Sequence, residues 1–167
     1  MRERTAVARR PGRASARAPR GFRAVAGAIA LGTAVALTGC SSTPEEPELK
    51  VDGAFMPQPV NDMAAGFLTV HNSGSAADKL TAVTSALSDN VTIHESKGQK
   101  MRQLRSVAVP ANGELNLERG GSHIMFMQLK EQPKKGQTVA VKLHFEKSDP
   151  ITVELPVKEP TYNPAKH

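Results

Sequence analysis

The sequence is poor in cysteine and in aromatic residues, and both shortages limit what the chain can do. Its 167 residues include one cysteine, Cys40, no tryptophan and one tyrosine. One cysteine allows no disulfide within the chain. If its sulfur is modified, as its sequence context indicates below, no thiolate remains for a zinc, iron–sulfur or blue-copper site. Any transition-metal site must then use histidine, methionine and carboxylate side chains.

The part of the chain after residue 39 also lacks an excess of positive charge. The whole sequence has 22 basic and 16 acidic residues, a net charge of +6. Eight of the basic residues and one acidic residue lie in residues 1–39, so 14 basic and 15 acidic residues remain, a net charge of −1. Because a basic footprint is the first requirement for binding nucleic acid, we expect no nucleic-acid partner.

Residues 1–39 have the pattern of a secretory signal peptide. Eight arginines precede an uncharged apolar run over residues 24–37, and the sequence Leu-Thr-Gly-Cys ends at Cys40. The run is shorter than the roughly 20 residues that a membrane-spanning helix needs. The last four letters resemble a bacterial lipobox, which predicts lipidation of Cys40. The alternative is an uncleaved membrane anchor, and either places the domain in an extracytoplasmic, membrane-anchored position.

The remaining chain divides into a short tether, one domain and a tail. Residues 40–48 comprise the lipidated cysteine and a polar, proline-bearing segment typical of a flexible tether. Residues 49–158 are long enough for one hydrophobic core. Residues 159–167 are poor in apolar side chains, and we expect them to form a disordered tail.

The domain contains short runs of strand-forming residues separated by turn signals, and no pattern of a helix of ten or more residues. This spacing predicts an all-β sandwich or barrel. The runs are residues 49–55, 66–71, 79–84, 91–95, 101–104, 106–109, 114–117, 123–129, 138–145 and 151–157.

Two histidine–methionine pairs fall on strands of this pattern. His123, Met125 and Met127 share one strand face, because successive side chains of a strand point to opposite faces. Packing of the two methionines in the core is the alternative interpretation. A two-residue turn at Lys97-Gly98 would place His94 directly opposite Met101, also on one face. The second pair follows from turn geometry without reference to the first.

The donor atoms of these four side chains favour Cu(I). Thioether sulfur is soft and selects Cu(I) over hard ions, and imidazole binds copper as well. Zinc favours cysteine, histidine or carboxylate ligands. An uncharged set without thiolate can hold Cu(I) and still release it to an acceptor that offers cysteine. A catalytic copper centre needs a vacant position, which four ligands would fill, so we expect a carrier and not an enzyme.

The sequence resembles the bacterial copper chaperones called PCuAC. Their pattern is a histidine, a loop, a methionine, twenty-one residues and His-x-Met, and here residues 102–122 separate Met101 from His123. The segments Ala-Gly-Phe-Leu-Thr-Val at 65–70 and Gly-Gly at 120–121 also match, over about residues 49–146.

The resemblance implies a cupredoxin-like antiparallel Greek-key β-sandwich. It also implies a site that binds Cu(I) and delivers it to cytochrome c oxidase or its assembly factors. The implied ligands are His94, Met101, His123 and Met125. Met127 is not a ligand in the family.

The sequence departs from the family pattern at three places. Six residues separate His94 from Met101 where about ten are usual, Arg119 replaces a frequent proline, and the tail offers His167 alone instead of a His/Met-rich extension. We expect His71 and His144 to be solvent-facing strand residues. We expect the protein to be a monomer and its partner to be a copper-accepting protein. The alternative function is a metal-free, membrane-tethered interaction module, because β-sandwiches host many functions.

Overall fold

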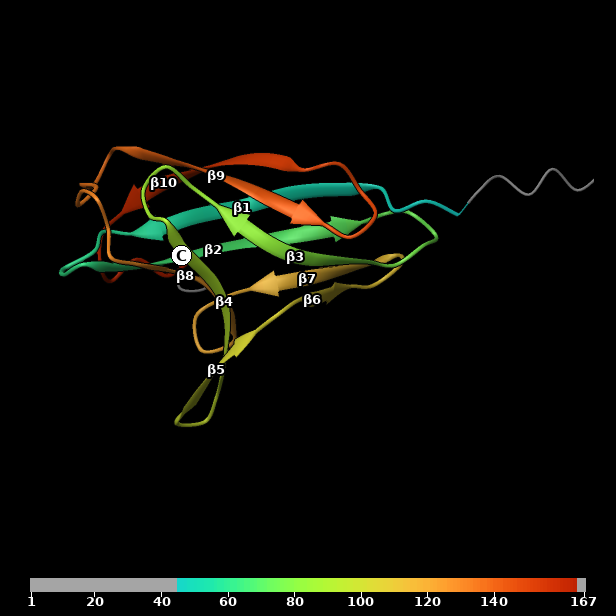
Figure 1. Ribbon diagram of the computed structural model, residues 1–167, viewed down its shortest axis with the longest axis horizontal. Coiled ribbons are helices and arrows are strands. Elements are labelled where there is room, and N and C mark those ends of the chain that lie inside the picture. The colour runs from blue at the N-terminus through green and yellow to red at the C-terminus, as the bar shows by residue number, and fades with distance from the viewer. Residues whose placement is uncertain (1–44, 165–167) are drawn as a thin grey trace, which may run out of the picture. The chain divides into compact units, whose positions relative to one another are not determined.

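The computed structural model describes residues 45–164, and it is built from ten β-strands without an α-helix in that range (Figure 1). Each strand overlaps one of the runs expected from the sequence, so the all-β prediction is confirmed. The strands are β1 Leu49–Pro57, β2 Met63–Asn72, β3 Asp78–Thr84, β4 Asn90–Lys97, β5 Lys100–Leu104, β6 Val107–Val109, β7 Gly113–Leu117, β8 Ser122–Met127, β9 Thr138–Phe145 and β10 Ile151–Lys158.

The strands form two layers that are joined along one seam. One layer has the order β5-β4-β8-β7-β2-β1 and the other β10-β9-β3-β6. They meet where β1 runs parallel to β10, at Met56 beside Val157. The pairing of β7 with β8 is also parallel, at Leu117 and Ser122, and the other strand pairs are antiparallel. The sandwich, which was expected to be antiparallel, is therefore mixed, because β1 with β10 and β7 with β8 are parallel pairs.

The core lies between the layers and is mainly aliphatic. On β8, Ile124 and Phe126 are fully buried and point inward. Other fully buried side chains come from both layers: Met56, Leu68, Val70, Leu80, Val109, Leu117, Val141, Leu143, Leu155 and Val157. Because side chains alternate along a strand, the inward position of Ile124 and Phe126 turns His123, Met125 and Met127 to the outer face.

Strands β4 and β5 form a hairpin that extends beyond the rest of the sandwich (Figure 1). Its turn residues are Gly98 and Gln99, and Gly98 has φ +62°. A positive φ at the first central residue suits a type II′ turn, where glycine is preferred. The sequence-based turn at Lys97-Gly98 is therefore wrong by one position. His94 lies opposite Gln103, and Met101 lies opposite Ser96.

Residues 159–164 pack onto the outer face of the six-stranded layer. The ring of Tyr162 meets Phe55 of β1 edge-on, with 5.1 Å between ring centroids. Arg119 donates hydrogen bonds to the carbonyl oxygens of Pro160 and Tyr162. These residues were expected to belong to a disordered tail; aromatic packing holds them instead. The predicted signal peptide, Cys40, residues 41–44 of the predicted tether and residues 165–167 lie outside the described residues.

Within residues 45–164 no helix is long and apolar enough to cross a membrane.

Candidate metal centre

The four candidate ligands come from three neighbouring strands, β5, β4 and β8. His94 lies directly opposite His123, and Met125 lies two residues further along β8, opposite Thr92. Met101 pairs with Ser96, which is two residues from His94 on β4. Directly paired residues and residues two apart share a sheet face. The register therefore places all four side chains on the outer face of this part of the sheet.

His94 is the most unusual member of the group. Both of its ring nitrogens are buried, and within the described residues neither has a hydrogen-bond partner. Burial lowers the pKa of His94, and the charge of His123 lowers it further. The ring is therefore neutral near pH 7, with one nitrogen lone pair available. A buried polar group without a partner costs free energy, which a ligand at that nitrogen would offset.

His123 is held in an orientation that suits a metal ligand. It is 6% exposed, and its ring centroid lies 6.0 Å from that of His94. Its Nδ1 lies 3.2 Å from the carbonyl oxygen of Gly121. Because a carbonyl oxygen can only accept, this hydrogen bond places the proton on Nδ1 and leaves the lone pair on Nε2. Histidine ligands of metals commonly donate their other N–H to such an oxygen.

The same carbonyl oxygen connects the hairpin to β8. The amide of Ser96 donates to the Gly121 oxygen over 3.1 Å, in addition to the ring of His123. Ser96 is the cross-strand partner of Met101. One backbone oxygen therefore fixes both the orientation of His123 and the part of the hairpin that carries Met101.

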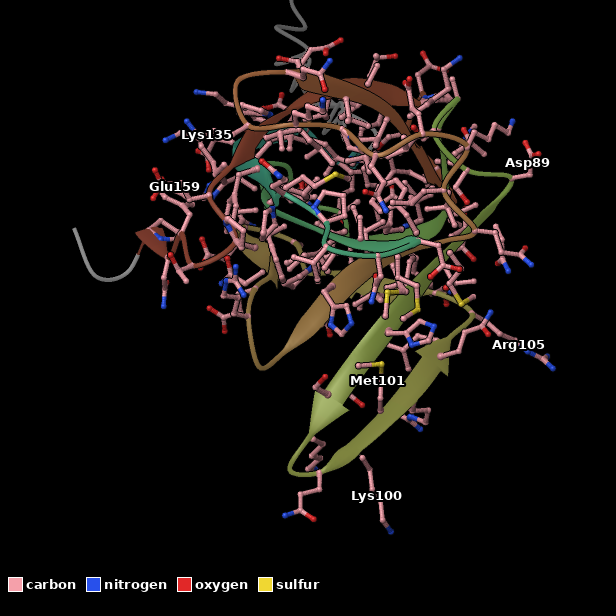
Figure 2. All side chains as sticks on the ribbon, turned by 90° about the vertical axis from the view of Figure 1, so that its left-hand side faces the viewer. Asp89, Lys100, Met101, Arg105, Lys135 and Glu159 are labelled. Carbon is pink, nitrogen blue, oxygen red and sulfur yellow. The ribbon has the colours of Figure 1, made fainter. Side chains whose placement is uncertain are left out.

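The two methionines differ in exposure. Met125 is half-buried, whereas Met101 is 55% exposed near the tip of the hairpin (Figure 2). Met127 occupies the next outer position of β8, opposite Met63 of β2. The outer face thus carries a strip of thioethers, of which Met101 is the member most open to solvent.

An aromatic wall beside His123 was not foreseen from the sequence. The ring of Phe67 lies 6.4 Å from the His123 ring, and Phe55 lies 5.1 Å from Phe67. The Arg119 guanidinium carbon lies 5.4 Å from the centre of the Phe67 ring. Arg119 stands out in the sequence only as a departure from the family pattern, which does not indicate this contact. Phe67 is itself buried, beside the ring of His123.

The donor set matches a soft ion better than a hard one. Within residues 45–164, no group of three or more His, Cys, Asp or Glu side chains is arranged to hold a metal. The candidate centre contains imidazole and thioether donors and no carboxylate. Cu(I) accepts both imidazole nitrogen and thioether sulfur. The unpartnered nitrogens of His94 and the oriented Nε2 of His123 therefore fit this ion together with the methionine sulfurs.

The other strand histidines are engaged elsewhere. His71 lies between two carboxylates, with Nε2 3.1 Å from Asp52 and Nδ1 3.3 Å from Glu114. The Nε2 of His144 lies 2.9 Å from the hydroxyl of Thr84. These contacts agree with a role at the sheet surface, as expected.

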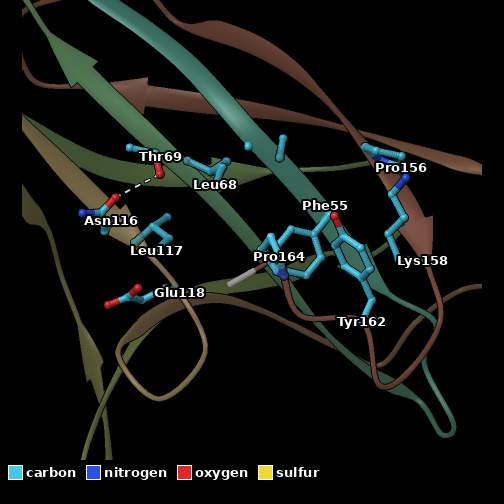
Figure 3. A pocket seen from close by; sticks show the side chains of 12 residues that line it. Phe55, Leu68, Thr69, Asn116, Leu117, Glu118, Pro156, Lys158, Tyr162 and Pro164 are labelled. Carbon is cyan, nitrogen blue, oxygen red and sulfur yellow. Dashed lines mark hydrogen bonds between the residues drawn. The ribbon is translucent and has the colours of Figure 1, made fainter. Parts of the chain in front are cut away.

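A pocket of about 380 Å³ opens beside the C-terminal segment (Figure 3). Phe55, Leu68, Leu117, Tyr162 and Pro164 supply its apolar wall. None of the four candidate ligands lines it. This pocket is therefore separate from the candidate centre.

Solved structures of PCuAC domains share this fold, among them the two described next. The copper-bound PCuAC domain from PmoF2 superimposes with a TM-score of 0.61 at 21% identity, covering 69% of this chain and 99% of that one. The solution structure of CuI-DR1885 from Deinococcus radiodurans has a TM-score of 0.58 at 25% identity, covering 74% and 85%. The protein therefore has the cupredoxin-like sandwich of PCuAC domains, and the resemblance predicted from the sequence is confirmed.

The family is defined by a second comparison. The family model described as "Putative lipoprotein LpqE-like" matches residues 49–157. A relative from Leifsonia xyli subsp. xyli (strain CTCB07), described as "Putative lipoprotein Lxx21020", is 32% identical over 137 residues. That match covers 74% of this chain and 82% of the relative. The chain belongs to the LpqE-like family of lipoproteins.

Proposed function

We propose that the protein is an extracytoplasmic copper chaperone. It binds one Cu(I) through His94, His123, Met101 and Met125, and it passes the ion to a copper-accepting protein. The observation that carries the proposal is the pair of buried, unpartnered nitrogens on His94, next to His123 and on the sheet face of both methionines. The copper-bound PmoF2 domain and CuI-DR1885 share the fold, which supports copper as the cargo.

The geometry supports holding and releasing the ion. Two imidazoles and two thioethers are neutral, so the bound ion keeps its positive charge and stays attractive to an anionic acceptor. Thiolate is a stronger soft ligand than thioether. We expect exchange to begin at Met101, because its exposed thioether is the donor that an acceptor can displace first. Copper remains Cu(I) throughout, so the step needs no oxidant or reductant.

The family supports an attachment to the membrane. Residues 46–48, which were expected to belong to the tether, pack against the domain at Asn72, Ser73 and Gly74. Lipidation at Cys40 would therefore leave residues 41–45 as the tether. At about 3.5 Å per extended residue, this tether reaches at most roughly 18 Å. A monomeric domain on such a tether can meet membrane-bound acceptors, and we propose cytochrome c oxidase or one of its assembly factors.

The test is a Cu(I) titration of residues 41–167 under reducing conditions, with bathocuproine disulfonate as the competitor. We expect one Cu(I) per chain. Replacing a ligand should weaken binding at least about 100-fold, because changes next to metal ligands already cost 10–100-fold. Met101→Leu and His123→Ala are the site variants, and Met127→Leu is the matched control.

Two results would overturn the proposal. One is the absence of Cu(I) binding by the wild-type domain, which would leave the metal-free interaction module. The other is equal affinity in the wild type and in both site variants, which would place the ion elsewhere.

A further inference from the structure

The β4–β5 hairpin carries a charge opposite to that of the rest of the domain. We call residues 95–105 the arm. The arm has four basic residues and one acidic residue, a net charge of +3. The other residues from 45 to 164 include nine basic and fourteen acidic residues, a net charge of −5. The described domain is therefore an electric dipole with its positive end at the arm.

The two faces of the arm differ in chemistry. Ser96 pairs with Met101, which places the exposed thioether on the face of the candidate centre. Glu95 pairs with Arg102, and Lys97 pairs with Lys100, on the opposite face. In Figure 2 Lys100 extends from the tip away from the sandwich, whereas Met101 lies against the strands. An approaching molecule meets cations and a soft donor at the same end of the protein.

The cations of the arm are mostly unused within the domain. Arg102 forms an ion pair with Glu95 over 2.9 Å. Within the described residues, Lys97, Lys100 and Arg105 form no ion pair, and all three are exposed. Like charges that face each other across two strands destabilise a hairpin. The direct pairing of Lys97 with Lys100 is therefore unfavourable for folding, and a role in binding explains it better.

We propose that the arm is the docking surface for an acidic face of the copper-accepting protein. The proposal rests on the proposed function and names the chemistry of its partner. The dipole orients the domain as it approaches, and attraction of this kind raises association rates by about 10- to 1,000-fold. Docking at the tip brings Met101 to the acceptor's own sulfur ligands.

An anionic membrane fits the arm less well than an acidic protein does. Sequences that bind anionic lipid commonly cluster four to eight basic residues, each contributing about 1 kcal/mol. The arm has three unpaired cations, and Arg102 is neutralised by Glu95. Lipid headgroups also offer no soft ligand for the ion beside Met101.

The test compares Cu(I) transfer from the loaded protein to two synthetic peptides. Both contain the same Cys-x-x-x-Cys pair, and one is rich in glutamate where the other has glutamine. As the ion moves, the cysteine thiols release protons to solvent and copper stays Cu(I). Stopped-flow measurement at low ionic strength should show transfer to the glutamate peptide about tenfold faster. Near 1 M salt, where screening acts over about 3 Å, the preference should vanish.

Two matched double variants distinguish an effect of the charges on the arm from an effect of the net charge of the protein. Lys97→Glu with Lys100→Glu should abolish the preference for the glutamate peptide and leave Cu(I) affinity within twofold. Lys134→Glu with Lys142→Glu makes the same change in net charge at exposed positions outside the arm, and should keep the preference. An unchanged preference in the arm variant would overturn the proposal, as would an equal loss in both variants.

Further measurements distinguish an acidic protein from a membrane or a second copy as the partner of the arm. They also distinguish the docking proposal from the proposed copper function. Arm-dependent binding to phosphatidylserine vesicles without a peptide preference would overturn the proposal in favour of a membrane. Self-association of the wild type that the arm variant loses would overturn it in favour of a second copy. NMR titration of the metal-free protein with the glutamate peptide should shift signals of the arm. If those shifts occur but the protein binds no Cu(I), the copper function fails and the docking surface stands.

Discussion

Replacing His94 by leucine tests whether this residue is present for a ligand or for the fold. Leucine has a similar volume and removes the two buried nitrogens that have no partner among the described residues. A buried, unsatisfied polar group costs about 1–3 kcal/mol. The metal-free variant should therefore be more stable than the wild type by about 1–3 kcal/mol. Most substitutions destabilise a protein, so an increase in stability would be unusual.

Urea unfolding of residues 41–167 without Cu(I) measures the cost of the buried nitrogens, and unfolding with Cu(I) measures the stabilisation by the bound ion. At a free Cu(I) concentration of 100 times Kd, binding stabilises the wild type by about 2.7 kcal/mol. Copper should therefore stabilise the wild type and leave His94→Leu unchanged. His144→Leu is the control, because that ring bonds an exposed threonine; it should change stability by less than about 0.5 kcal/mol. Destabilisation of metal-free His94→Leu by 1 kcal/mol or more would show that the His94 side chain contributes to the stability of the fold.

Three further predictions concern the ligands and the fold. Met101→Leu should speed the release of Cu(I) to bathocuproine disulfonate in stopped flow more than Met127→Leu does; equal rates would remove Met101 from the site. Asp78 is buried, and although burial raises its pKa, hydrogen bonds from Ser148, Lys79 and Lys147 lower it overall. The unfolded chain then binds this proton more tightly than the folded chain does. The stabilisation by the Asp78 carboxylate is therefore present above about pH 3.8 and is lost as the pH falls through the lowered pKa. Asp78→Asn should flatten that part of the curve of stability against pH in an acid titration. At Gly74 a Cβ atom would lie 2.2 Å from the Glu46 carbonyl oxygen. Gly74→Ala should therefore lower the free energy of unfolding in urea by about 3 kcal/mol. A loss below about 0.5 kcal/mol would contradict this packing.

The strands were predictable because each follows a local pattern. The alternation of Val139, Val141 and Leu143 with polar residues gives β9 directly, and these three side chains are buried in the structure. The parallel contact of β1 with β10 joins segments far apart in the sequence. That of β7 with β8 joins two strands separated by a tight turn. No local periodicity encodes such pairings, so the sequence could not predict them.

The hairpin shows why the sheet face of Met101 was predicted correctly and its register with His94 wrongly. Placing the turn at Lys97-Gly98 instead of Gly98-Gln99 moves the partner of His94 by two residues, from Gln103 to Met101. A shift of two residues preserves the face on which a side chain lies, whereas a shift of one reverses it. Met101 therefore lies on the expected face, diagonal to His94 and not opposite it.

Other features of the site depend on contacts between distant segments. The burial of the His94 nitrogens, the hydrogen bond from His123 to Gly121, and the aromatic wall around Phe67 all require the folded sheet. Tyr162 lies in a segment of low apolar content, so its packing on Phe55 gave no signal in the sequence. These contacts define the environment of the donors, whereas the residue types alone indicated the ion.

X-ray absorption at the copper edge of the loaded domain identifies the atoms bound to the ion. We expect Cu(I) with two sulfur and two nitrogen neighbours, and a loss of one sulfur neighbour in Met125→Leu. A first shell of nitrogen and oxygen alone, or an unchanged sulfur signal in that variant, would contradict this expectation.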